Sequence, residues 1–264
     1  MEKKALFFDI DGTLLSEVTG KVPESARKAV EEAVNKGHLC FINTGRTRCS
    51  LPLEVKGIPF SGYLCGCGTQ IMYGDEQLYS HRISRERRKE LVECILSCKA
   101  EAVLEGREDC YFSSQRYRFE QVESLRRYFR KMGIGIEKYF DREEVDFDKF
   151  IVYVDRQTDQ ETLFARMERD MAIIDRRGGL YEIVPKECSK ATAIRRVLDH
   201  FQIPLDHAYV FGDSNNDLAM FQCVPHAIAM KKHDPALEPF TEYITASVEE
   251  DGIACAMKHY GLIE

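Results

Sequence analysis

Two apolar runs of strand length, each followed at once by acidic residues, constrain the fold of this chain most strongly. Ala5–Phe8 precedes Asp9-Ile10-Asp11-Gly12-Thr13, and residues 208–211 precede Gly212-Asp213-Ser214-Asn215-Asn216-Asp217. Short runs of this bulk are typical of buried parallel strands, and the carboxyl ends of parallel strands share one crevice. Acidic clusters brought to one crevice repel each other unless a cation lies between them, and oxygen ligands favour magnesium. Together the clusters predict a magnesium-dependent enzyme that handles phosphate.

The segments around these runs alternate between strand and helix patterns. A helix is expected near 24–36, strands near 39–44 and 63–65, and a further helix over 190–200 directly before the second apolar run. Such alternation is typical of a doubly wound sheet with helices on both faces. The fold class predicted for these segments is therefore α/β, with a Rossmann-like parallel-sheet core.

The middle of the chain has a different pattern. Charged helices are expected near 84–101, 119–132 and 158–170, with strands near 103, 111, 150–155 and 181–184. Because helices and strands of this kind indicate an α+β unit, we expect a cap domain over 83–185 that interrupts a core made of 1–82 and 186–264. No low-complexity linker marks the two crossings, so short hinges are expected there.

Composition and the absence of certain sequence patterns limit the classes of partner and the cell compartment that we expect. The net charge of −7 and the lack of a long basic cluster argue against nucleic acid. No apolar run approaches ~18 residues and the first residues lack a signal-sequence pattern, so we expect a cytoplasmic protein with no membrane partner. The ten cysteines are expected to be reduced, since Cys65-x-Cys67 and Cys94-x-x-x-Cys98 do not match a paired zinc framework. A redox role for Cys65 and Cys67 is the open alternative.

Asp9 and Asp11 are the candidate catalytic pair. Asp9 ends a buried strand beside a turn that contains Gly12, so its carboxylate and neighbouring backbone amides are expected at the mouth of the crevice. An ionised carboxylate there can attack phosphorus and give an acyl phosphate that water later hydrolyses. Asp11 can donate or accept a proton at the leaving oxygen. An ordinary turn is the alternative for this pentapeptide, and the second cluster weighs against it.

The second cluster supplies candidate metal ligands. Asp213 is expected to complete a magnesium shell with Asp9. Asp217, at the start of a helix, would hold a metal-bound water or act only as a helix N-terminal charge. Asn216 and Ser214 would donate to phosphate oxygens or cap that helix, and phosphate binding is favoured for Asn216.

Two further segments are expected to bind the phosphate. Thr44-Gly45-Arg46 follows a strand, and its hydroxyl and turn amides can hold an anion. Lys190 opens a helix after Ser189, where a cation opposes the helix dipole, so an anionic partner would explain it better than mere exposure.

In this order, Asp9-x-Asp11-Gly-Thr, Thr44-Gly-Arg, Lys190 and Gly212-Asp213-Ser-x-Asn216-Asp217 resemble the motifs of the haloacid dehalogenase (HAD) superfamily. The resemblance spans the chain, and the insertion ahead of Lys190 is similar to that of Cof-like phosphatases with a large class IIB cap. It implies that Asp9 is nucleophile and metal ligand, and that Asp11 is the acid/base and a backbone-carbonyl ligand. It also implies that Thr44 and Lys190 clamp the phosphate and that Asp213 binds metal, with support from Asn216 and Asp217.

An aspartate at position 11 is what phosphatases and phosphomutases of this superfamily carry, which favours hydrolysis of a small phosphomonoester such as a sugar or cofactor phosphate. A phosphomutase of the same fold and a non-catalytic phosphometabolite-binding module are the alternatives. Arg46, and cap residues such as Arg118, could contact the leaving group, although a solvated loop is favoured for the cap residues. Cys67 and Ser214 depart from the family's usual asparagine and glycine, and the departure at Cys67 leaves the substrate unassigned by analogy. Nothing in the sequence identifies an obligate interface, so the oligomeric state is unassigned as well.

Overall fold

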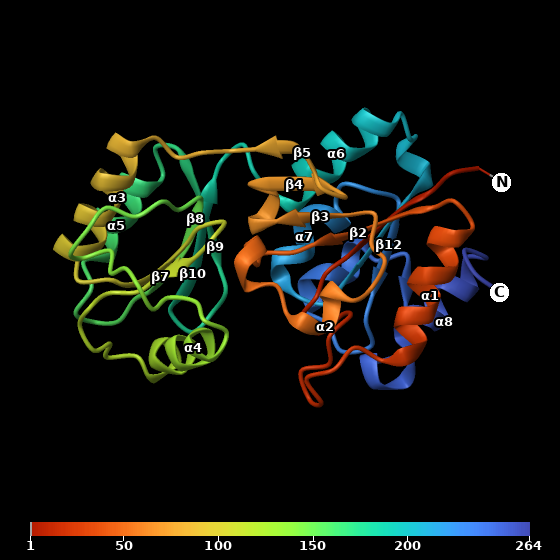
Figure 1. Ribbon diagram of the computed structural model, residues 1–264, viewed down its shortest axis with the longest axis horizontal. Helices are drawn as coiled ribbons and strands as arrows, with labels where there is room; N and C mark the ends of the chain where they lie inside the picture. Colours follow the sequence, from red (N-terminus) through yellow and green to blue (C-terminus); the bar gives the residue numbers. More distant parts are fainter. Residues whose placement is uncertain (1) are drawn as a thin grey trace. The chain divides into compact units, whose positions relative to one another are not determined.

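The computed structural model describes residues 2–264 and divides into two compact units (Figure 1). The first unit contains the chain up to Gly45, then Leu51–Tyr79 and Ser189–Glu264. The second contains Arg46–Ser50 and Ser80–Cys188. The short segment Arg46–Ser50 therefore groups with the second unit although it directly follows Thr44 and Gly45 of the expected phosphate-binding turn, and the chain rejoins the first unit at Leu51.

The first unit is built on an eight-stranded sheet in the order β13-β12-β11-β1-β2-β3-β4-β5. Every pairing from β13 to β3 is parallel, and β4 runs antiparallel to β3. The strands are β1 (Ala5–Phe8), β2 (Leu39–Asn43), β3 (Gly62–Cys65), β4 (Gln70–Tyr73), β5 (Glu76–Ser80), β11 (Ala208–Gly212), β12 (His226–Ala229) and β13 (Tyr243–Ile244). β1 and β11 are central neighbours, paired Ala5 to Ala208 through Phe8 to Phe211.

Helices cover both faces of this sheet, and alternate residues of β1 point to the two sides. Leu6 and Phe8 pack with α1 (Glu24–Asn35) and α8 (Gly252–His259), which lie side by side in Figure 1. Phe7 packs on the other side with α6 (Lys190–Phe201) and α7 (Leu218–Phe221). The short α2 (Leu53–Lys56) adds Val55 to the first of these clusters.

The start of α6 is fixed by its capping residues. The Ser189 side chain accepts a hydrogen bond from the Thr192 amide at 3.0 Å, and the Thr192 hydroxyl accepts one from the Ser189 amide at 2.9 Å. This reciprocal capping box satisfies amide donors that have no partner within the helix. Ile194 and Val197 are fully buried against the sheet, so both capping and packing hold Lys190 at the first helical position.

The second unit is an antiparallel five-stranded sheet in the order β7-β6-β8-β10-β9. α3 and α5 contribute to the hydrophobic cluster on one side, and α4 contributes to the cluster on the other. The elements are α3 (Arg85–Ser97), β6 (Glu101–Glu105), β7 (Cys110–Tyr111), α4 (Glu120–Lys131), β8 (Lys149–Tyr153), α5 (Gln160–Met167), β9 (Met171–Asp175) and β10 (Leu180–Pro185).

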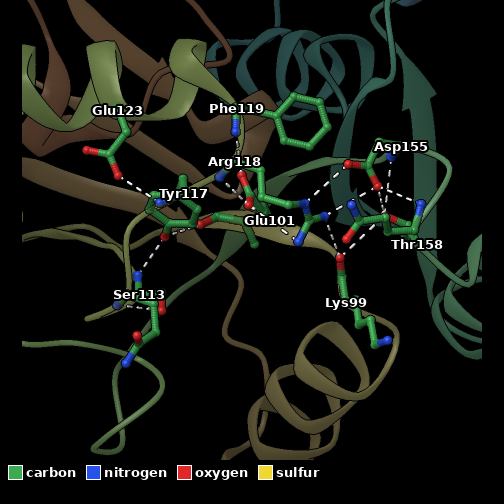
Figure 2. A network of polar contacts seen from close by, with 12 residues as sticks. Lys99, Glu101, Ser113, Tyr117, Arg118, Phe119, Glu123, Asp155 and Thr158 are labelled. Carbon is green, nitrogen blue, oxygen red and sulfur yellow. Dashed lines mark hydrogen bonds and ion pairs between the residues drawn. The ribbon is translucent and has the colours of Figure 1, made fainter.

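A polar network fixes the loop before α4 (Figure 2). Glu101, only 7% exposed, accepts hydrogen bonds from the amides of Arg118 at 2.6 Å and Phe119 at 3.0 Å. The Arg118 guanidinium donates to Asp155 at 3.2 Å and to the Lys99 carbonyl at 3.0 Å. Arg118 is thus engaged in holding this loop.

No helix among residues 2–264 has the length and apolar character needed to cross a membrane.

Candidate active site

Asp9 and Asp213 lie at the same edge of the first unit's sheet. The Asp9 amide donates to the Phe211 carbonyl at 3.0 Å, so the ladder between β1 and β11 continues one residue beyond β1. Asp213 follows the last residue of β11. Parallel pairing therefore brings together two acidic residues that are about 200 positions apart in the sequence.

Lys190 connects the two acidic clusters. Its Nζ donates to Asp9 Oδ1 at 2.6 Å and to Asp217 Oδ1 at 2.5 Å. The lysine is 1% exposed, Asp9 is 4% exposed and Asp217 is fully buried. A buried ammonium requires such partners, because an unpaired charge in this setting is costly. The lysine that sequence analysis associated with phosphate is thus held in direct contact with the expected nucleophile.

Asp217 organises the loop that carries Asp213. Its Oδ2 accepts hydrogen bonds from the Asp213 amide at 2.9 Å and the Ser214 amide at 3.0 Å, while its Oδ1 accepts from Lys190. Both oxygens therefore already accept hydrogen bonds from this unit. Asn216 lies in the same turn, where its Oδ1 accepts from the Ser214 hydroxyl at 2.7 Å.

The turn after β1 packs directly on Asp213. Thr13, which is fully buried, donates its hydroxyl to Asp213 Oδ1 at 2.8 Å. Gly12 has φ +83°, and a Cβ there would collide with the Asp213 carboxylate, so both backbone and space require glycine. Sequence analysis included Thr13 in the pentapeptide but, unlike Gly12, gave it no role. The signal for Thr13 was its place in the same pentapeptide.

The carboxyl end of β2 lies next to the start of α6. The Thr44 amide donates to the Leu64 carbonyl at 2.9 Å, and the Thr44 carbonyl accepts from the Cys67 amide at 3.0 Å. Asn43, fully buried, donates from Nδ2 to the Lys190 carbonyl at 3.1 Å. The contact joins the strand that precedes Thr44 to the helix that carries Lys190. Sequence analysis did not select Asn43, although a polar residue ending a buried strand was a usable signal.

Asp11, Gly45 and Arg46 are the remaining residues that the sequence predicted for this site. Asp11 is half-buried and its negative charge acts on Asp9. Gly45 is the last residue of its segment in the first unit, whereas Arg46 belongs to the second unit and donates to the Ser50 carbonyl at 3.2 Å. A role of Arg46 toward substrate therefore stays a prediction.

Burial and mutual repulsion perturb the ionisation of this cluster. Burial, with the negative charges of Asp217 and Asp11, raises the pKa of Asp9 to about 7 even though Lys190 opposes the shift. Burial and the charges of Asp9 and Asp217 raise the pKa of Asp213 to about 8. Burial alone would lower the pKa of Lys190, but Asp217 and Asp9 raise it well above its ordinary value. Lys190 contacts the carboxylates of Asp9 and Asp217 and also opposes the shift at Asp213, so one lysine serves three acidic side chains.

The donor set fits a hard divalent cation. One carboxylate oxygen each from Asp9, Asp213 and Asp217 lies within 4.8 Å of the others. All-oxygen ligands suit magnesium, and a cation would counteract both the burial and the repulsion that raise the pKa values of Asp9 and Asp213. Asp9 and Asp213 are the better candidate ligands, because both oxygens of Asp217 already accept hydrogen bonds.

Residues 6–257 match the family model of the haloacid dehalogenase-like hydrolases. The chain belongs to this family. As a HAD hydrolase it is 28% identical to "Putative phosphatase YkrA" of Bacillus subtilis (strain 168), with both chains covered completely. It is 26% identical to the 5-amino-6-(5-phospho-D-ribitylamino)uracil phosphatase YwtE of the same organism, over 95% of this chain and 96% of that protein.

A comparison with solved structures agrees with the assignment of the chain to this family. The HAD subclass IIB sugar phosphatase BT4131 superposes with a TM-score of 0.83 at 25% identity, over 99% of this chain and all of that chain. The predicted family and the predicted α/β fold class with a Rossmann-like core are thereby confirmed, as is the expectation of a HAD-type phosphatase at the level of enzyme class.

Proposed function

We propose that this hydrolase is a magnesium-dependent phosphatase that cleaves a small organic phosphomonoester through an aspartyl phosphate on Asp9. The observation that carries the proposal is the buried contact of Lys190 Nζ with Asp9 Oδ1 at 2.6 Å, at the sheet edge where Asp213 also lies. A nucleophile for phosphorus needs a carboxylate that stays ionised and a nearby cation that binds the incoming phosphate oxygens. Lys190 supplies the nearby cation and opposes the burial that raises the pKa of Asp9, and a bound magnesium ion would favour the ionised carboxylate further.

The residues divide the chemistry among themselves. Asp9 attacks phosphorus, and Asp11 gives a proton to the departing oxygen and then takes one from the attacking water. Lys190 and the Thr44 hydroxyl, with the amides near Gly12 and Gly45, bind the phosphate oxygens. A bound magnesium ion would supply positive charge next to the reacting group. Its proposed ligands are the carboxylates of Asp9 and Asp213 and the backbone carbonyl of Asp11.

Supporting residues hold this set in place. Asp217 is proposed to act by orienting Lys190 and the Asp213 loop, through contacts of 2.5 Å and 2.9 Å, and by holding a metal-bound water. Thr13 is proposed to orient Asp213 through its hydroxyl at 2.8 Å. Preorganised groups of this kind supply much of an enzyme's rate enhancement.

Sugar phosphates and cofactor phosphates are the proposed substrate classes. They agree with two relatives named above, a phosphatase of a phosphoribitylamino-uracil and a sugar phosphatase. The second unit is proposed to act as a cap that selects the leaving group. A cytoplasmic location stays a prediction.

A phosphatase assay with para-nitrophenyl phosphate, with and without magnesium, tests the proposal. We expect turnover that requires magnesium and that is lost in Asp9→Asn, which keeps the size of the side chain. A phosphomutase would move phosphate between hydroxyls and release little inorganic phosphate. A binding module would show no turnover at all, and either outcome would overturn the proposal.

A further inference from the structure

A pair of thiols, Cys49 and Cys110, lies in the second unit. Cys49 Sγ is 3.8 Å from Cys110 Sγ, and Thr47 Oγ1 lies 3.5 Å from the first sulfur and 3.9 Å from the second. Cys49 Sγ also donates to the Gly106 carbonyl at 3.4 Å. The two cysteines are 61 positions apart in the sequence, so the fold, and not local sequence, brings them together.

The two sulfurs differ in access and in ionisation. Cys110 is fully buried in β7, whereas Cys49 is half-buried. The hydrogen bond from Cys110, together with that from Thr47, lowers the pKa of the Cys49 thiol, and the same contact with Cys49, with burial, raises the pKa of Cys110. A more accessible thiol of lowered pKa beside a buried thiol is the arrangement of an attacking and a resolving cysteine.

The position of Cys49 in the chain determines which segments a bond between the two sulfurs would join. Cys49 belongs to Arg46–Ser50, which packs with the second unit although the residues before and after it belong to the first. The segment directly follows Thr44 and Gly45. A bond between the two sulfurs would fasten this crossing segment to β7.

We propose that Cys49 and Cys110 form a reversible dithiol–disulfide site, and that its oxidation restrains the Arg46–Ser50 segment and slows turnover. The oxidant is a low-molecular-weight disulfide. The Cys49 thiolate attacks one of its sulfurs, forms a mixed disulfide and releases one thiol. Cys110 then attacks the Cys49 sulfur, its proton passes to the departing thiolate, and a second thiol leaves. The protein loses two hydrogen atoms and the oxidant gains them.

The two sulfurs are already close to each other. A disulfide requires sulfurs about 2.05 Å apart, so the present separation of 3.8 Å must shorten for the bond to form. Restraint of a loop beside an active site typically lowers kcat. As part of the proposal, we expect a tether on the segment that follows Gly45 to act on turnover more than on the affinity for phosphate.

Treatment of the full chain with glutathione disulfide, followed by peptide mapping without reductant, tests the site. We expect a Cys49–Cys110 linked peptide that disappears on reduction. In Cys110→Ser a glutathione adduct should accumulate on Cys49, and in Cys49→Ser no linked peptide should form. Cys255, an exposed thiol of the first unit, is the control for unselective reaction. A stable glutathione adduct on wild-type Cys49, or a link to another cysteine, would overturn the proposal.

The effect on turnover is the second readout, and it rests on the proposed function. We expect oxidation to lower kcat at least about threefold in the wild type, with recovery after reduction, and to leave kcat of Cys49→Ser unchanged. An unchanged kcat in fully cross-linked protein would overturn the regulatory part. Peptide mapping reports on the sulfurs alone, so a failure of the proposed phosphatase activity is distinguishable from a failure of this site.

Discussion

Removal of the charge at Lys190 should destabilise the protein in a pH-dependent manner. Lys190→Met keeps an unbranched side chain of similar length but removes the ammonium that contacts Asp9 at 2.6 Å and Asp217 at 2.5 Å. With all three residues nearly inaccessible to water, the variant leaves two buried carboxylates without their cation. Breaking a buried ion pair from one side typically costs about 3–5 kcal/mol, and we expect a loss of that size near pH 8 without magnesium.

The sign of the pH dependence follows from the pKa of Asp9. Burial already raises this pKa from 3.8 to about 7 with Lys190 present, and loss of the lysine raises it further. A carboxyl whose folded-state pKa exceeds its unfolded value contributes stability that is complete below the unfolded pKa and is lost as pH rises through the folded pKa. The variant can therefore protonate Asp9 and recover part of the loss at about pH 5. The deficit should grow as pH rises from about 5 to about 8.

Urea unfolding at both pH values, with a chelator present, measures this deficit as a difference in the free energy of unfolding. Lys28→Met is the matched control, because Lys28 lies on α1 with 74% of its side chain exposed and should show no measurable change at either pH. The reasoning is refuted if Lys190→Met loses less than about 1 kcal/mol near pH 8, or if its loss is equal at the two pH values.

Three further predictions concern this carboxylate cluster and the strand end next to it. Thr13→Val removes the hydroxyl 2.8 Å from Asp213 and should weaken magnesium binding about tenfold, because a hydrogen bond to a charged group contributes about 1.5–3 kcal/mol. Calorimetry measures this affinity; Thr13→Ser should restore the wild-type value, and equal affinities in all three proteins would contradict the prediction. Magnesium affinity should increase as pH rises through about 7 and about 8, where Asp9 and Asp213 lose protons, and a flat calorimetric profile would be inconsistent. Cys67 has φ +53°, a conformation that asparagine adopts more readily than a β-branched residue does. Cys67→Asn should therefore be tolerated, whereas Cys67→Val should lower the free energy of unfolding by about 1–3 kcal/mol in thermal unfolding. Equal stabilities of the two variants would count against backbone strain at this position.

The sequence predicted the acidic edge of the first sheet because local signals carry it. Apolar runs before Asp9 and Asp213 indicate buried strands, and parallel pairing then determines that their ends meet. Lys190 could be predicted from its place at a helix start after Ser189. The boundary of α3 was less predictable: a helix to residue 101 was expected, but Lys99 takes φ +56° and Glu101 begins β6.

Contacts between distant side chains could not be predicted in this way. Asp217 satisfies Lys190 and the Asp213 loop at once, and this depends on the folded positions of three segments. Likewise, Arg46 follows Gly45 directly but belongs to the second unit, because its segment packs there. The β4–β5 extension of the sheet was also missed, although Gly74, at φ +53°, marks the turn between its strands.

Detection of the phosphorylated residue tests the central claim most directly. Protein mixed with substrate and magnesium, quenched in acid during turnover and reduced with borohydride, should yield homoserine at position 9 in peptide mass spectrometry, because borohydride reduces an acyl phosphate but not a free carboxylate. Asp11→Asn, which lacks the group proposed to activate water, is the variant expected to accumulate the intermediate if its first step survives. Homoserine at position 9 in the wild type would support Asp9 as the nucleophile. Continued turnover with no modification at position 9, or with homoserine at another aspartate, would contradict it.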